Sequence, residues 1–140
     1  MTRKLEEDIR FTAESLARNF ADRGNFDFSI ESLQSLDELL EEAGDFDLEE
    51  EQLDSISSMA GCYMFEVARR NFGGVYVWSP DRQQPVLITG EPDFSVSLFA
   101  FDKVRGRIRN GTEDNIPFYF SGYMQAVEKG RGTGYCATII

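Results

Sequence analysis

The segment EVARRNFGG, residues 66 to 74, holds the side chains best suited to chemistry in this sequence. The guanidinium of Arg70, the amide of Asn71 and the N–H groups of the glycines could together bind an anion, because all of them donate hydrogen bonds. Arg105 or Arg109, from a later basic segment, would complete such a site. One hypothesis is therefore a small-molecule sensor or enzyme with a pocket here. Its candidate ligand-binding residues are Glu66, Arg70, Asn71, Tyr76 and Trp78.

The same segment can be interpreted as a helix that simply ends. Anions are attracted to helix N-termini, whereas these basic residues suit a C-terminus. Gly73 or Gly74 would supply the left-handed cap before a strand begins. Glu66 and Arg70 stand four residues apart with the acid first, the favourable order for a helical ion pair, and Arg69 should point into water. The sequence favours this structural interpretation over an anion site.

Several kinds of chemistry are excluded by composition. The sequence has no histidine, so histidine-dependent catalysis and HExxH zinc sites are excluded. Cys62 and Cys136 lack CxxC spacing, and we expect reduced thiols with Cys62 buried; the alternative is one disulfide between them. The acidic run DFDLEEE fails as an EF-hand loop, since Glu50 replaces the required glycine. We predict no metal, no cofactor and no catalytic residue, which favours a non-enzymatic protein.

The net charge of −11 is unevenly distributed along the chain. Residues 1–58 carry 17 acidic and 5 basic side chains, whereas residues 59–140 carry 8 and 9. Such an acidic face repels a phosphate backbone, so we expect no nucleic-acid partner. It suits a basic protein partner, or it only keeps solvated helix faces soluble. The hypothesis that the sequence favours is thus an immunity-like or regulatory interaction domain, with partner-binding residues Glu38, Glu41 and Glu42.

Two helices are predicted at the start of the chain. Apolar residues at helical spacing predict an amphipathic helix over residues 3–22. Ser29 is well placed as the N-cap of a second helix, which ends at Gly44 and turns its leucines inward. The residues of this helix expected to face water are Asp37, Glu38, Glu41 and Glu42.

A third and longer helix is predicted over residues 48–72. Asp47 and Glu50 form a pair like a capping box at its start. Small residues around Gly61 could allow another element to approach closely. The apolar face of this helix is predicted to consist of Leu53, Ile56, Ala60, Tyr63 and Val67.

After the two glycines the pattern changes to alternation, which indicates strands. VYVWS, PVLIT and FSVSLFAF, joined by short turns, predict an antiparallel meander. KVRGRIR then predicts a short helix capped by Asp102, with Val104 and Ile108 facing inward. Its cations, expected to lie mostly outside, could bind an acidic ligand or pair with the acidic helices, and the second is favoured; they are Lys103, Arg105, Arg107 and Arg109.

Asp114 is predicted to cap a last helix near residues 115–129, followed by an extended tail. The tail is expected to add a strand within a monomer or to extend the sheet of a homodimer. We therefore predict one α+β domain of about five helices packed on a small antiparallel sheet of three or four strands. No apolar run could cross a membrane and no signal peptide is present, so a cytoplasmic location is expected. The parts are an acidic helical part (1–72), a β meander (73–100), two helices (101–129) and the tail (130–140).

Five segments together resemble a loose group of small bacterial α+β domains of unknown function. They are FSIESLQSLDELLEE, AGCYMFEVARRNFGGVYVW, PVLITG, FDKVRGRIRNG and IPFYFSGY, which span roughly residues 27 to 124. The group shares a long helix ending in an EVxRRxxGG-like segment. The resemblance implies the α+β architecture and a bacterial origin; the group has no established activity, so it implies no functional residue. The positions that match its pattern are Glu66, Arg69, Arg70, Gly73 and Gly74.

Overall fold

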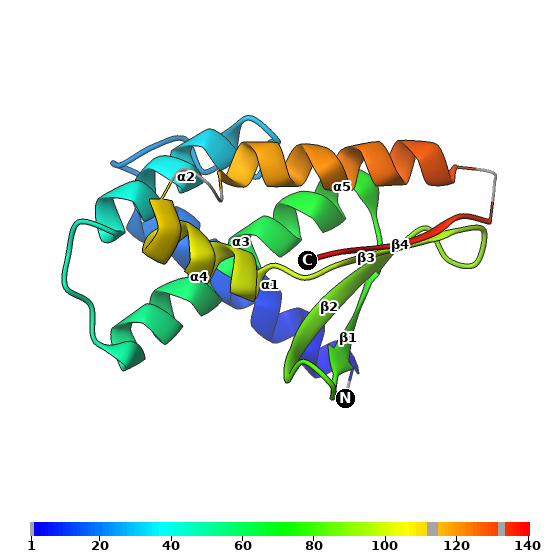
Figure 1. The fold of residues 1–140 in the computed structure, drawn as a ribbon, viewed down its shortest axis with the longest axis horizontal. Coiled ribbons are helices and arrows are strands. Elements are labelled where there is room, and N and C mark those ends of the chain that lie inside the picture. The colour runs from blue at the N-terminus through cyan, green and yellow to red at the C-terminus, as the bar shows by residue number, and fades with distance from the viewer. Residues whose placement is uncertain (1, 112–114, 132–133) are drawn as a thin grey trace.

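The structure, a computed structural model, describes residues 2–111, 115–131 and 134–140, which form five helices packed on a four-stranded mixed sheet (Figure 1). This confirms the predicted α+β class. In chain order the elements are α1 (Thr2–Asn19), α2 (Ser32–Ala43), α3 (Glu50–Phe72), β1 (Val75–Ser79), β2 (Gln84–Thr89), β3 (Ser95–Leu98), α4 (Phe101–Asn110), α5 (Ile116–Gly130) and β4 (Cys136–Ile139). None of the described helices is long and apolar enough to cross a membrane.

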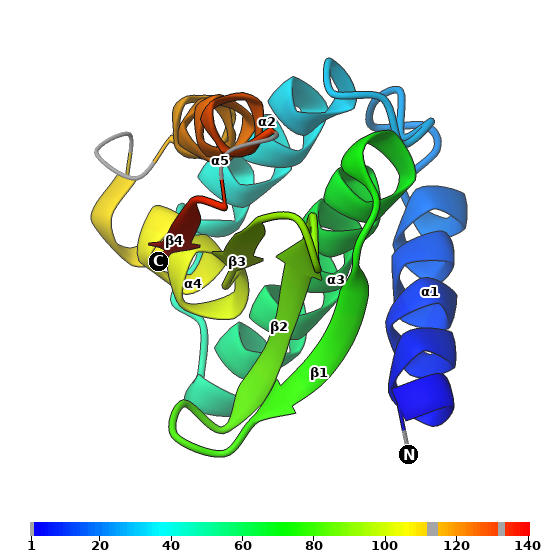
Figure 2. The ribbon, with the colours of Figure 1, turned by 90° about the vertical axis from the view of Figure 1, so that its right-hand side faces the viewer.

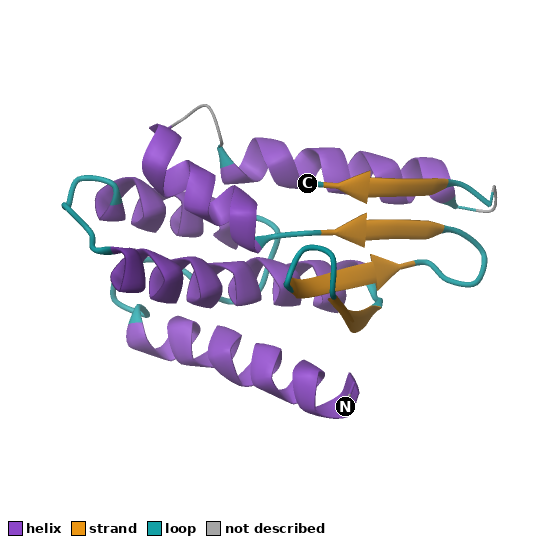
Figure 3. Ribbon diagram, turned by 60° about the horizontal axis from the view of Figure 1, so that its bottom comes forward, coloured by secondary structure: helices purple, strands orange, loops and turns teal. Residues whose placement is uncertain are grey.

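The sheet has the strand order β1-β2-β3-β4. The first three strands form the predicted antiparallel meander. β4 pairs with β3 in parallel, with Val96 opposite Ala137, so the prediction of a wholly antiparallel sheet was wrong (Figure 3). The reason is the connection through α4 and α5, which is long enough to bring the chain back in the same direction. The tail therefore adds an edge strand to the sheet of its own chain.

α3 lies at the centre of the molecule, between α1, α4 and the sheet (Figure 2). Every residue from 60 to 68 is buried, so the middle of α3 is buried on all sides and not only along the single apolar face that was predicted. A helix surrounded by other elements is buried all round. The close approach predicted at Gly61 is confirmed: a Cβ placed there would lie 2.3 Å from the ring of Phe101 in α4.

α2 packs mainly on α4 and α5, which come much later in the chain (Figure 1). Its N-terminal end is joined to α3 by a hydrogen bond of 2.6 Å between the hydroxyls of Ser32 and Tyr63. The predicted cap Ser29 lies one turn early, because the helix begins at Ser32; its hydroxyl accepts the Ser32 N–H in the preceding turn. α2 ends before Gly44, as predicted.

The starts of three other helices differ from the predicted caps. The capping box of α3 is formed by Glu49 and Gln52, two residues after the predicted pair. α4 begins at Phe101 because the third strand ends at Leu98, so Asp102 lies in the first turn of the helix and is not its N-cap. Asn115 caps α5 by accepting the N–H of Phe118. The predicted cap, Asp114, is outside the described residues.

Candidate functional site

Glu66 lies at the centre of the predicted anion site, and its carboxylate is already fully engaged. It is completely buried and accepts hydrogen bonds from Arg69 at 2.7 and 3.0 Å, from Arg70 at 3.0 Å and from Tyr76 at 2.7 Å. The prediction that Arg69 points into water was wrong. Its side chain reaches back one turn and binds Glu66 through two nitrogens, as side chains three residues apart in a helix can.

The neighbouring donors also have partners within the chain. Arg70 donates to Glu14 of α1 at 3.1 Å, and its guanidinium lies 3.8 Å from the centre of the Phe28 ring. The amide of Asn71 donates to the carbonyl oxygens of Val67 at 2.8 Å and Phe28 at 3.0 Å. The structure thus brings together four of the five predicted ligand-binding residues, but as a network that ties α1, the loop before α2 and β1 to the end of α3.

The fifth residue, Trp78, is 51% exposed, whereas Tyr76 on the same strand is 1% exposed. Burial raises the pKa of Glu66, but hydrogen bonds from Arg69, Tyr76 and Arg70 outweigh it, and the pKa lies below its ordinary value. Burial and the charge of Glu66 raise the pKa of the Tyr76 hydroxyl. Glu66 is therefore ionised and Tyr76 protonated at neutral pH, which suits a structural role.

Arg105 and Arg109 do not complete this site, contrary to the anion-site hypothesis. Both form ion pairs with Glu50, and Arg105 also pairs with Asp54, at the first turns of α3. Arg70 lies sixteen residues beyond Asp54 along the same helix, which corresponds to about 24 Å. The structure confirms for Arg105, Arg107 and Arg109 the alternative prediction that the cations of α4 pair with the acidic helices.

Arg107 is the exception to the predicted pattern of α4, because it is buried and not exposed. Its guanidinium binds the carboxylate of Asp37 at 2.8 and 3.0 Å and that of Glu41 at 2.5 Å. Asp37, predicted to face water, is only 4% exposed. A buried charge needs a partner, and each of these two side chains supplies it for the other.

The three predicted partner-binding acids all lie on α2, in different surroundings. Glu41 holds Arg107, and Glu42 forms an ion pair with Arg23. Glu38 accepts a hydrogen bond of 3.4 Å from Gln34 and has no ion pair among the described residues. Of the three, Glu38 alone presents a charge to solvent that no cation of the described chain neutralises.

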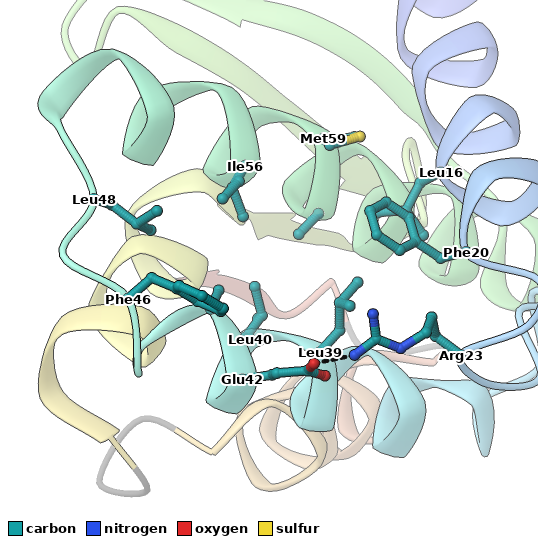
Figure 4. Close-up of a pocket in the computed structure, with 12 residues that line it drawn as sticks. Leu16, Phe20, Arg23, Leu39, Leu40, Glu42, Phe46, Leu48, Ile56 and Met59 are labelled. Carbon is teal, nitrogen blue, oxygen red and sulfur yellow. Dashed lines mark hydrogen bonds and ion pairs between the residues drawn. The ribbon is translucent and has the colours of Figure 1, made fainter.

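An apolar groove of about 250 Å³ opens between α1, α2 and α3 (Figure 4). The groove exists because α2 packs against α4 and α5. The side of α2 that carries Leu39 therefore lies opposite α1 and α3. The ion pair of Arg23 and Glu42 stands at its edge (Figure 4). The apolar side chains that line it are Leu16, Phe20, Leu39, Leu40, Ala43, Phe46, Leu48, Ile56, Met59 and Ala60.

The loop between α2 and α3 closes one end of this groove. Phe46 and Leu48 line it, while the alternating residues Asp45, Asp47 and Glu49 are exposed. The Phe46 side chain remains 67% exposed, which is unusual for a large aromatic residue. The sequence interpretation treated this acidic run only as the start of a helix. In the structure these exposed acidic residues alternate along the chain with Phe46 and Leu48, which line the groove, and we call Asp45, Asp47 and Glu49 the acidic rim.

Within the described residues, no three histidine, cysteine or acidic side chains are grouped so as to hold a metal ion. Cys62 and Cys136 are free thiols and Cys62 is buried, as expected; Cys136 is exposed. Comparisons with protein-family models, with curated proteins and with solved structures give no match. The resemblance to the group of small bacterial domains therefore stays a prediction.

Proposed function

We propose that this chain is a non-enzymatic interaction domain that binds a basic amphipathic helix of another protein in the groove between α1, α2 and α3. The observation that carries the proposal is the apolar floor of this groove beside an acidic rim. A helix with one apolar face and basic flanks would place apolar side chains in the groove and cations against the rim. An immunity-like or regulatory role in a bacterial cytoplasm is consistent with such binding.

Charge complementarity favours a basic helix over an acidic or neutral one as the partner in the groove. Asp45 and Asp47 flank the exposed Phe46, and like Glu38 they have no ion pair among the described residues. Residues 1–58, which include all the residues lining the groove except Met59 and Ala60, carry most of the negative charge of the sequence. Unpaired charges at the rim of an interface accelerate association and make it sensitive to salt. An acidic or neutral helix would gain only the apolar contact.

The alternative hypothesis, a ligand pocket around Glu66 and Arg70, is less well supported. The carboxylate of Glu66 and the donors of Arg70 and Asn71 are already bonded within the chain. A ligand would have to replace these contacts, and the elements that they join would then separate. The groove offers apolar surface without that loss.

The test measures binding of a fluorescently labelled synthetic helix of leucine and lysine, about five turns long. Fluorescence anisotropy should show binding that weakens as salt rises. The variant Met59→Glu, which places a charge on the groove wall, should lower the affinity at least about tenfold. Phe118→Glu is the control, because Phe118 lies on α5 and is 80% exposed. Equal binding by both variants, or by a scrambled non-amphipathic peptide, would overturn the proposal.

The acidic rim is tested separately. The double variant Asp45→Lys, Asp47→Lys should weaken the peptide and reduce the salt dependence, with the circular dichroism spectrum unchanged. A matched control reverses two exposed acids at the sheet, Asp81→Lys and Asp93→Lys. Glu41 is unsuitable for this purpose, because a lysine there would face Arg107. If both double variants weaken binding equally, net charge and not the groove determines the affinity.

A further inference from the structure

A second pocket, of about 280 Å³, lies where the β1–β2 turn meets α3 and α4. It is polar and differs in this from the groove, which uses another side of α3. Ser57 of α3, Gln84 of β2 and Asp102 of α4 lie on its wall, together with Arg82 from the turn. No residue here belongs to the groove or to the Glu66 network.

Two atoms of this wall lack any hydrogen-bond partner among the described residues. They are the hydroxyl oxygen of Ser57 and the amide oxygen of Gln84, and both side chains are at least nine-tenths buried. The amide nitrogen of Gln84 donates to the Asp102 carboxylate at 3.1 Å. That contact fixes the orientation of the amide, because a carboxylate only accepts, so the amide oxygen is the free acceptor. Buried polar atoms are nearly always bonded, and two exceptions in one pocket need an explanation.

Two side chains of the pocket, Arg82 and Asp102, carry opposite charges and could each bind a charged group of a ligand. The guanidinium of Arg82 lies 4.9 Å from the centre of the Phe99 ring and forms no ion pair within the described residues. Asp102 accepts from Gln84 but likewise has no ion pair there. Arg105, the other cation of the pocket, is neutralised by Glu50 and Asp54. Judged by the described part of the chain, the pocket therefore offers one cation, Arg82, and one anion, Asp102, without an ion-pair partner.

We propose that this pocket binds a free α-amino acid as its zwitterion. The ligand carboxylate would accept from Arg82, which suits a planar carboxylate. Its ammonium group would donate to Asp102 and to the amide oxygen of Gln84. The Ser57 hydroxyl can serve either end, since a hydroxyl both donates and accepts. A phosphate or other simple anion is disfavoured by the negative charge of Asp102.

This inference concerns a different site and ligand from the groove, so its failure would not affect the proposed function, and the failure of the proposed function would not affect it. The first experiment titrates each of the common L-amino acids into the ¹⁵N-labelled chain and follows amide chemical shifts. Shifts of residues around Ser57, Gln84 and Asp102 are expected for at least one amino acid. The N-acetyl derivative, which lacks the cation, and the methyl ester, which lacks the anion, should each bind at least tenfold more weakly.

Two variants link the binding to the named atoms. Ser57→Ala removes an unpartnered hydroxyl, so the fold should be retained while the amino acid binds several-fold more weakly; Ser55→Ala, at an exposed neighbouring position, is the control. Arg82→Gln should abolish discrimination between the amino acid and its methyl ester. Failure of every amino acid to shift these amides at millimolar concentration would overturn the proposal. So would equal binding of glycerol, which would show a general polar cavity.

Discussion

Arg107 of α4 and Asp37 of α2 meet in the interior of the molecule, seventy residues apart in the chain. Two hydrogen bonds of 2.8 and 3.0 Å join the guanidinium to the carboxylate. Asp37 also accepts the backbone N–H of Ile116 at 2.9 Å and the amide of Asn115 at 3.3 Å. One carboxylate therefore holds α2, α4 and the start of α5 together.

Replacing Arg107 with methionine should destabilise the fold strongly. The Asp37 carboxylate would stay buried without its cation, and removing one member of a buried pair costs about 3–5 kcal/mol. The free energy of unfolding from urea titration measures this loss. Arg109→Met is the matched control, because that side chain is 53% exposed in its ion pair and should cost less than about 1 kcal/mol. Similar losses for the two variants would contradict the structural role of Arg107.

Acid should weaken the fold partly through Glu66. Because its pKa in the folded chain lies below the ordinary value of 4.5, the folded state binds a proton less readily than the unfolded state. The resulting stabilisation is complete above the pKa of the unfolded chain and is lost as the pH falls below 4.5 and through the lower folded value. Glu66→Gln should have a lower free energy of unfolding than the unchanged chain at pH 7, and this difference should shrink as the pH is lowered stepwise below 4.5. A constant difference in unfolding free energy would contradict this.

Two helical glycines should respond in opposite directions to alanine. Alanine gains about 1 kcal/mol over glycine in a helix, but overpacking costs about 1–3 kcal/mol. At Gly61 the new Cβ would lie 2.3 Å from the Phe101 ring, so overpacking should prevail and the melting temperature should fall. At Gly122 no described atom beyond the adjacent residues and the local helix backbone would lie within 4 Å of the new Cβ, so Gly122→Ala should raise the melting temperature. A rise for both variants would mean that α4 adjusts easily at Phe101.

The two thiols should react at very different rates with a reagent such as DTNB. Burial, together with the charges of Glu66 and Asp8, raises the pKa of the Cys62 thiol to about 12, so little reactive thiolate forms. Cys136 is exposed on β4. One thiol per chain should therefore react in the folded state and the second only after unfolding. Cys136→Ser should remove the fast reaction; its persistence would show that Cys62 is accessible.

Local patterns predicted most of the fold. Helical spacing indicated the five helices, and alternation with short turns indicated the meander of β1, β2 and β3. The parallel partner of β3 could not be foreseen, because the pairing of Val96 with Ala137 leaves no signal near either residue. Several predicted N-caps are one or two residues from the observed ones, since acidic and hydroxyl residues occur on both sides of the true helix starts.

The charged contacts were only partly predictable. The pair of Glu66 and Arg70 follows from helical spacing, which is a local rule. The orientation of the Arg69 side chain was predicted wrongly, because the angular position of a residue on a helix does not determine where the end of a long side chain lies. Asp37 and Arg107 each stand in a charged run that resembles a solvated helix face, and their contact depends on how α2 and α4 pack. The groove depends on the same packing.

The attachment of α2 to α4 and α5 also determines how the molecule can open. α2 meets α3 through a polar contact at one end, while the pair of Asp37 and Arg107 secures it to the later helices. The acidic helical part, residues 1–72, therefore does not form a separate cooperative block, and α2 belongs energetically to the second half of the chain. Because α2 is one wall of the groove, a salt bridge on its far side controls how far that groove can widen.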